Sequence, residues 1–320
     1  MRITQRSAKS GALVLVLAGL GGAVLHSLPE PADHAVRPTV ERDLDTWSMP
    51  LDGYAQPGWS ETGYAESLLD QSCLRDVGID FPVPWATSAG LQAESIADET
   101  PERGNDAPAL DWSRPLSKAA AADLGYHRPS ARGANRDGWR QWAEDPEHNA
   151  AFDRADRSAV DRCFERSRRA LGTDDDGEAQ GASMTAKRLT YLAADEARRE
   201  PAVVAAAARW RTCLGPHAPS ALPEDPHGMP TAPMRQAFGI SGLALPVTKP
   251  EIALAEHDLA CQQSSGYREA LYDAQWSRLL HVTATDAAVL AAARPDQLAV
   301  ADRVARTIER LAPEAPEGVD

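Results

Sequence analysis

Positive charge is scarce in this sequence of 320 residues, which has 33 Lys and Arg residues against 47 Asp and Glu residues and a formal net charge of −14. Lysine is the rarer cation, with only 4 residues among these 33. Binding to nucleic-acid phosphates or to anionic lipid surfaces depends on clustered cations that release counterions. The acidic balance therefore disfavours nucleic acid as a partner.

The short motifs that mark common enzyme classes are also missing. The sequence has no G-x-S-x-G nucleophile turn, no H-E-x-x-H zinc helix and no glycine-rich phosphate loop. Nucleotide chemistry is unsupported, and we expect no cofactor. One enzyme class stays open, an extracytoplasmic hydrolase whose catalytic residues are dispersed along the chain. Such a site would need a deep pocket that brings together carboxylates or histidines with perturbed pKa values.

Sustained alternation of apolar and polar residues, the pattern of β-strands, does not occur in the sequence. Apolar residues recur instead every three or four positions, so the predicted fold class is all-α. The predicted helices cover about 61–77, 117–124, 154–171, 184–199, 200–214, 250–282 and 295–311. A long polar loop is expected over 86–115, and the last helix is expected to pack on the 250–282 helix.

The first 25 residues have the layout of a secretory signal peptide. Three cations, Arg2, Arg6 and Lys9, precede an uncharged apolar run over 11–25. That run is shorter than the ~20 residues that span a bilayer as a helix. Cleavage near Ala23 is therefore favoured over an uncleaved membrane anchor, and the loss of the three cations would take the net charge from −14 to −17.

The predicted signal peptide places the protein outside the cytoplasm, either secreted or tethered at the cell surface. Residues 26–58 are rich in proline, aspartate and glycine and show no sustained periodicity, so we interpret them as a disordered leader. A helical domain over 59–320 follows. Any contact with the membrane is expected only through an uncleaved N-terminal segment.

The four cysteines of the chain are expected to form two disulfides, because thiols oxidise outside the cytoplasm. They are Cys73, Cys163, Cys213 and Cys261, and four cysteines allow three connectivities. The first and third cysteines lie in similar contexts, since each ends an apolar helix, is followed by leucine and precedes a proline-bearing extension. A further cysteine-bearing helix follows each of them.

This internal similarity suggests two related helical halves, about 59–181 and 182–320. The two similar stretches are SLLDQSCLRDVGIDFPVP at 67–84 and AAARWRTCLGPHAPSALP at 206–223. With two cysteines in each half, the favoured pairs are Cys73–Cys163 and Cys213–Cys261. Disulfides that close loops of such lengths stabilise a protein by roughly 3–5 kcal/mol in the chain-entropy model.

The cysteine-bearing segments also resemble those of a group of uncharacterised exported proteins of high-GC Gram-positive bacteria. The segments are CLRDVGIDF at 73–81, DRCFERSRRALG at 161–172, EPAVVAAAARWRTCL at 200–214 and EIALAEHDLACQQSSG at 251–266. Together with their surroundings they cover about half of the chain. Leucine stands at 74 and 214 where the group has methionine, and the lipid-bearing cysteine of its many lipoprotein-like members is missing. The resemblance implies an exported four-cysteine helical protein and brings no activity with it.

A zinc site is the alternative to the second disulfide. Cys213-x3-His217 and His257-x3-Cys261 have mirrored spacing, and residues four apart on a helix face the same way. Together they supply two cysteines and two histidines, a donor set that Zn²⁺ accepts in tetrahedral geometry. Gly215-Pro216 breaks the first helix, and an oxidising compartment converts the same cysteines to a disulfide, so we favour no metal.

Aromatic residues are few, at 6% of the chain, and one irregular segment is rich in them. Tyr126, His127, Trp139 and Trp142 are the candidate recognition residues, because binding residues are often carried by loops. The alternative, which we favour, is that their rings fill the junction between the two helical halves.

The function expected from these features is a non-enzymatic binding or interaction scaffold at the cell envelope. Its partner would be an envelope protein or a small ligand. The alternatives are the hydrolase described above and a small-ligand sensor, for which a closed apolar cavity between helices would be the mark.

Overall fold

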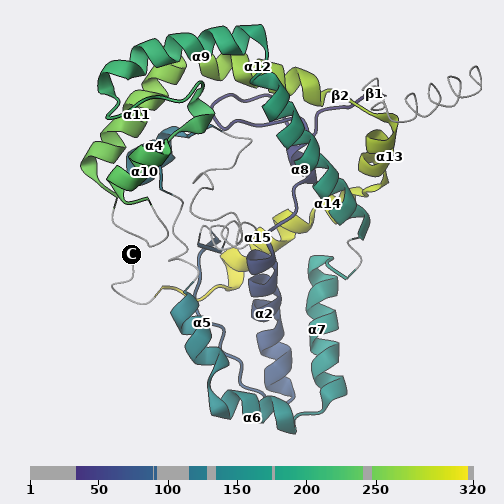
Figure 1. The fold of residues 1–320 in the computed structure, drawn as a ribbon. Helices are drawn as coiled ribbons and strands as arrows, with labels where there is room; N and C mark the ends of the chain where they lie inside the picture. Colours follow the sequence, from purple (N-terminus) through teal and green to yellow (C-terminus); the bar gives the residue numbers. More distant parts are fainter. Residues whose placement is uncertain are drawn as a thin grey trace, which may run out of the picture.

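The computed structural model describes residues 34–88, 90–91, 115–127, 135–174, 177–240 and 247–315, which form an all-α protein (Figure 1). The helices are α2 (Trp59–Asp76), α4 (Lys118–Leu124), α5 (Arg136–Ala143), α6 (Pro146–Arg154), α7 (Arg157–Leu171), α8 (Gly177–Ala197), α9 (Pro201–Leu214), α10 (Ala232–Phe238), α11 (Lys249–Ser264), α12 (Tyr267–Leu279), α13 (Ala284–Ala292), α14 (Pro295–Leu298) and α15 (Val300–Leu311). Two-residue strands, β1 (His34–Ala35) and β2 (His281–Val282), pair antiparallel. The predicted signal peptide and most of the predicted 86–115 loop lie outside the described residues.

Capping residues set the ends of several helices. The side chain of Asp145 accepts hydrogen bonds from backbone N–H groups in the first turn of α6, and Pro146 occupies the first helical position. Asp156 caps α7 in the same way, and Gly172, with φ +75°, ends it. The helix predicted over 154–171 therefore divides at Asp156, which is extended, and only its later part belongs to α7.

The helix predicted over 250–282 is two helices. α11 ends at Ser264 and α12 begins at Tyr267. Between them Gly266 adopts φ +71°, a left-handed conformation that glycine reaches without a steric penalty and that stops an α-helix. The apolar spacing continues through this break, which is why it predicted one helix.

Buried apolar side chains gather in three clusters that join distant parts of the chain. The first contains side chains from residues 47–51 and from α8, α9, α12 and α13. The second contains side chains from α2, α7, α15 and the extended segment after α2. The third joins α4 and Tyr126 to the end of α9, α10 and α11. The clusters do not follow the predicted division into halves at residue 181, because α4 packs on α11 and α15 packs on α2.

The last helix does not pack where the sequence analysis placed it. Val300, Val304 and Ile308 of α15 are buried in the cluster of α2 and α7, and Figure 1 shows α15 above those two helices. The apolar stripe of the helix is buried as the sequence predicts, but it packs on α2 and α7 rather than on the predicted 250–282 helix. A stripe shows which face is buried and not which helix covers it.

Two disulfides link pairs of helices. Cys73–Cys163 joins α2 to α7 with a Cα–Cα distance of 5.7 Å, and Cys213–Cys261 joins α9 to α11 at 5.6 Å. These are the two pairs that the sequence favours, and they are consistent with an oxidising, extracytoplasmic environment. Within the described ranges, no helix combines the length and the apolarity needed to cross a bilayer.

Residues 34–58, called the N-terminal strap here, are part of the fold, so the prediction of a disordered leader is wrong for this segment. Trp47, Met49 and Leu51 are each no more than 3% exposed and pack in the first cluster. Trp47 adopts φ +56°, which is costly for a bulky residue, and its burial offsets that cost. Periodicity could not reveal the strap, because single side chains rather than a repeated stripe anchor it.

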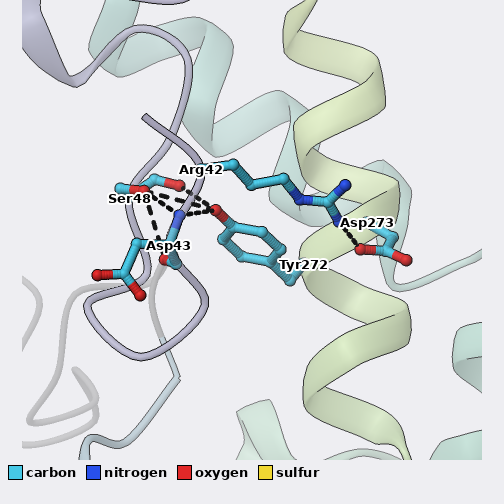
Figure 2. A network of polar contacts seen from close by, with 5 residues as sticks. All are labelled: Arg42, Asp43, Ser48, Tyr272 and Asp273. Atoms are coloured by element: carbon cyan, nitrogen blue, oxygen red, sulfur yellow. Dashed lines mark hydrogen bonds and ion pairs between the residues drawn. The ribbon is translucent and has the colours of Figure 1, made fainter. Parts of the chain in front are cut away.

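Polar contacts join the strap to the Tyr272 side chain of α12 (Figure 2). The backbone N–H of Asp43 donates to the Tyr272 hydroxyl at 2.9 Å, and that hydroxyl donates to the backbone oxygen of Ser48 at 2.8 Å. An ion pair between Arg42 and Asp273 lies beside them. The two hydrogen bonds close the strap into a loop around one tyrosine, which fixes the position of Trp47.

We expect Trp47→Ala to lower the free energy of unfolding by roughly 3–5 kcal/mol, the usual loss for a large aromatic side chain in a core. The substitution also removes the hydrogen bond from Trp47 Nε1 to Gln275 Oε1, 3.1 Å long. Trp59→Ala is the matched control, because Trp59 is 59% exposed, and its loss should stay within about 0.5 kcal/mol. Urea unfolding followed by circular dichroism measures both, and equal losses would show that the strap does not support the fold.

Candidate functional site

A surface groove with a volume of about 400 Å³ lies between α2 and α5, and it is called the aromatic groove here. Ligand pockets in proteins have volumes of about 300–1,000 Å³, so the groove is large enough for a small group. Its lining residues are Trp59, Ser60, Gly63, Tyr64, Ser67, Leu91, Arg136 and Trp139. Rings and aliphatic surface therefore form the walls, with one guanidinium at the side of α5.

Helical spacing explains why α2 supplies most of the lining. Trp59, Gly63 and Ser67 follow one another at intervals of four residues and so share one face of the helix. A Cβ atom added at Gly63 would meet no atom within 4 Å apart from its chain neighbours and the backbone of its own helix, so this glycine leaves an open floor between a tryptophan and a serine. Sequence reasoning missed this face, although a Trp-x3-Gly-x3-Ser series in a helix was a readable signal.

The far wall of the groove is rigid. Tyr64 is 2% exposed, and its hydroxyl accepts a hydrogen bond of 3.0 Å from the backbone N–H of Ala86. Burial raises the pKa of Tyr64 above its usual value, so the hydroxyl stays neutral. The ring of Trp139 meets the ring of Tyr64 edge to face at 5.8 Å, a geometry that aromatic pairs favour.

Trp139 is held in place from behind by a cluster of rings. Trp142 packs edge to face on Trp139 at 5.4 Å and on Phe81 at 4.6 Å. His148 lies 4.1 Å from Trp142, and burial lowers the pKa of His148. At the start of α5, the side-chain amide of Asn135 donates to the backbone oxygen of Trp85 at 3.0 Å. Of the two predicted tryptophans, Trp139 therefore lines the groove and Trp142 supports it.

The other two predicted recognition residues, Tyr126 and His127, lie in a different part of the molecule. Tyr126 is 1% exposed in the third cluster, and its backbone N–H donates to Glu251 Oε1 at 2.9 Å. His127 Nδ1 lies 2.8 Å from the same oxygen. The prediction of one aromatic recognition segment is therefore not supported. Tyr126 belongs to the third cluster, whereas Trp139 and Trp142 pack against the second.

Asp258 accepts hydrogen bonds from three side chains at the centre of the third cluster. Its carboxylate accepts from the Tyr126 hydroxyl at 2.9 Å, from Trp210 Nε1 at 2.8 Å and from Gln262 Nε2 at 2.9 Å. Burial raises the pKa of Asp258 to about 6, although these three donors act in the opposite direction. With 1% of its surface exposed and its oxygens occupied by these donors, the carboxylate links three segments and has no open side for a substrate.

Asp70 takes the same position relative to the other disulfide but has fewer partners. Asp70 precedes Cys73 by three residues, as Asp258 precedes Cys261. Burial raises the pKa of Asp70 to about 6, a hydrogen bond from Ser167 lowers it, and Oδ1 of Asp70 has no partner. The two disulfide-linked helix pairs thus each bury a carboxylate one turn from a cysteine.

The four proposed zinc ligands do not form a metal site in the disulfide-bonded structure. Cys213 and Cys261 are bonded to each other and offer no thiolate. His217 and His257 stack with their ring centroids 4.1 Å apart and their planes 15° apart. Across the described parts of the chain, no group of three or more His, Cys, Asp or Glu side chains is arranged to hold a metal ion.

A second hollow, of about 550 Å³, lies at the end of α9. Its lining residues are Ala208, Arg211, Thr212, Gly215, Ala218, Ser220, Ala221 and Leu222. Small side chains and backbone form most of this surface, with no ring among them. Recognition energy comes mainly from aromatic and arginine anchors. Each hollow is lined by one arginine, but only the aromatic groove is also lined by rings, so it is the better candidate for a binding site.

Comparisons with protein-family models, with curated proteins and with solved structures give no match to the chain. The groove is therefore interpreted from its own geometry. The similarity to exported four-cysteine proteins of high-GC Gram-positive bacteria stays a prediction from the sequence.

The two buried aspartates should respond in opposite ways to conversion into asparagine. Asp70→Asn removes a poorly partnered buried charge and should stabilise the protein at pH 7 by roughly 1–2 kcal/mol. Asp258→Asn presents an amide N–H to donors that have no other acceptor there, and it should destabilise by roughly 2 kcal/mol or more. Thermal unfolding of both variants at pH 7 checks the two signs.

The pH dependence of Asp70→Asn gives an independent readout. Burial raises the pKa of Asp70 from its ordinary value of 3.8 to about 6, so folding favours the protonated form of this side chain. The stability that the wild type has with Asp70 protonated is fully present below pH 3.8 and is lost as the pH rises through 6, because the buried carboxyl must then ionise. The variant should therefore lose less stability than the wild type between pH 4 and pH 6. Parallel curves for the two proteins would mean that Asp70 is not the group that titrates.

Proposed function

We propose that this protein is an extracytoplasmic binding scaffold that recognises an apolar, ring-bearing side chain of an envelope partner in the aromatic groove. The observation that carries this proposal is the groove itself, a hollow of about 400 Å³ with Trp59, Tyr64 and Trp139 around it. One such hollow accommodates a ring-sized group, and tryptophan and tyrosine are the side chains most enriched at recognition hot spots.

The exposure of Trp59 supports a protein partner over an enclosed small ligand. Trp59 is 59% exposed, and it is the most exposed large apolar side chain of the described residues. A sensor would instead enclose its ligand in a closed cavity between helices. A rim tryptophan beside a rigid wall suits a side chain that a second protein presents, because the partner covers the rim when it binds.

Location outside the cytoplasm is the second part of this proposal. Two disulfides agree with an oxidising compartment, and the expected signal peptide supplies a route to it. The acidic net charge of −14 favours a protein partner over nucleic acid or an anionic membrane surface. Whether the protein is secreted or tethered depends on cleavage near Ala23.

The hydrolase is the weaker alternative for the described residues. Its mark would be a pocket that joins carboxylates or histidines with perturbed pKa values. Asp258 and Glu251 are 1% and 0% exposed, and their partners are the side chains and backbone of the same cluster. A buried carboxylate that accepts from three protein donors holds a structure together more readily than it attacks a substrate.

Substitution at Gly63 tests the groove without touching a packed side chain. Gly63→Leu projects into the open floor, and leucine is the better helix former, so the fold should be kept. The probe is 8-anilinonaphthalene-1-sulfonate, whose fluorescence rises when its rings enter an apolar hollow. We expect Gly63→Leu to weaken binding of this probe by about tenfold or more, equal to 1.4 kcal/mol or more.

Gly181→Leu is the matched control for this experiment. Gly181 lies within α8, has the same open surroundings and does not line the groove, so its replacement should leave probe binding unchanged. N-acetyltryptophanamide should displace the probe from the wild type, and N-acetylalaninamide should not. Equal probe binding by the two leucine variants, or equal displacement by the two amides, would rule out the groove as the recognition site.

A further inference from the structure

The aromatic groove carries charge of one sign only. Among the described residues that line it, Arg136 is the one charged side chain, and the lining contains no carboxylate. Arg136 is exposed and begins α5, one turn before Trp139. Residues three apart on a helix share a face, with Cβ atoms about 5–6 Å apart. The groove therefore places a positive charge beside its aromatic wall.

The acidic side chains of α2 that lie next to the groove are engaged on the side of α7. Glu66 Oε1 accepts a hydrogen bond of 2.8 Å from the hydroxyl of Thr173, which follows α7 closely. Asp70 is 4% exposed and accepts a hydrogen bond from Ser167 of α7. Neither carboxylate lines the groove. Arginine stays charged and has five N–H donors, so Arg136 can bind an anion in addition to its contacts within the protein.

We propose that the groove recognises a chain-terminal aromatic residue of the partner, whose ring enters the groove and whose α-carboxylate pairs with Arg136. This inference rests on the function proposed above and adds the charge of the group that is bound there. A guanidinium and a carboxylate can form two parallel hydrogen bonds, which are stronger and more specific than one contact between neutral groups. The rings then supply contact area, and Arg136 selects an anion.

The short separation between the charge and the ring wall favours the carboxylate of the ring-bearing residue itself. In a terminal residue, only Cα and Cβ separate the carboxylate from the ring. In an extended chain the next side chain points to the opposite face, and the one after it is displaced by roughly 6–7 Å along the chain. An acidic side chain within a partner chain is therefore placed less well to reach Arg136 while a neighbouring ring fills the groove.

Two ligands that differ only in this charge test the proposal, N-acetyl-5-fluorotryptophan and its amide. Fluorine NMR titration with the full-length protein measures the affinity for each of them without a competing dye. We expect the acid to bind the wild type about three- to tenfold more tightly than the amide, as a charge-assisted pair at an exposed position allows. The preference should shrink in about 0.5 M NaCl, because salt screens exposed charges.

Arg136→Gln should abolish the preference for the acid, because glutamine has hydrogen-bond donors but no charge. Arg140→Gln is the matched control. Arg140 lies in the same helix, pairs with Asp137 at 2.9 Å and does not line the groove, so this variant should keep the preference of the wild type. Both arginines are exposed, so circular dichroism should show that both variants are folded.

A second pair of ligands separates a terminal carboxylate from an acidic side chain. Acetyl-alanyl-alanyl-5-fluorotryptophan carries its charge at the chain end, and acetyl-aspartyl-alanyl-5-fluorotryptophanamide carries it two residues before the ring. We expect the first peptide to bind more tightly, by about threefold or more, since its carboxylate lies closer to the ring. Equal affinity for the two peptides would overturn the assignment to a chain end.

The outcomes separate this inference from the function on which it rests. Equal binding of the acid and the amide to the wild type, or a preference that Arg136→Gln leaves intact, would overturn the role of Arg136 and leave the groove as a recognition site for neutral rings. If neither ligand binds the wild type, or if Gly63→Leu binds both as well as the wild type does, the proposed function is lost together with the inference.

Discussion

The fixed position of α2 is the constraint on which the candidate binding site depends. This helix supplies Trp59, Gly63 and Tyr64, and so most of the aromatic groove. α2 is held covalently to α7 through Cys73–Cys163 and is covered by α15, whose Val304 and Ile308 enter the same apolar cluster. A disulfide limits how far α2 and α7 separate, and apolar packing limits their rotation. Together the two restraints fix the helix that forms most of the groove.

The fold class and the disulfides were the parts that the sequence predicted well. Helical spacing of apolar residues is a local signal, and it survives whatever the tertiary packing turns out to be. The preference for Cys73–Cys163 and Cys213–Cys261 came from the similar contexts of the first and third cysteines. Local patterns were sufficient here, because each pair joins helices that the same patterns had already identified.

The features that the sequence did not reveal depend on partners distant in the chain. The strap is ordered because Trp47 finds Gln275 and Asp43 finds Tyr272, both more than 200 residues away. α15 was expected on the 250–282 helix but packs on α2, although its own stripe was correctly identified. Of the residues that line the groove, the sequence analysis predicts only Trp139 as a recognition residue. Trp59 and Gly63 were overlooked, because an exposed tryptophan and a glycine contribute little to a periodicity based on burial.

Each of the two disulfide-linked helix pairs buries an aspartate, but the two aspartates differ in the number of hydrogen-bond donors around them. Asp258 accepts hydrogen bonds from three side chains, although Oε2 of Glu251 and Oε1 of Gln262 on the same helix have no partner. Asp70 has an oxygen without a partner, and it lies one turn from Ser67, which lines the groove. Natural proteins retain such local instability more often near functional surfaces than elsewhere, since selection there acts on binding before stability. The unsatisfied carboxylate and the open floor at Gly63 therefore point to the same helix, and the disulfide next to them compensates for the stability that this helix lacks.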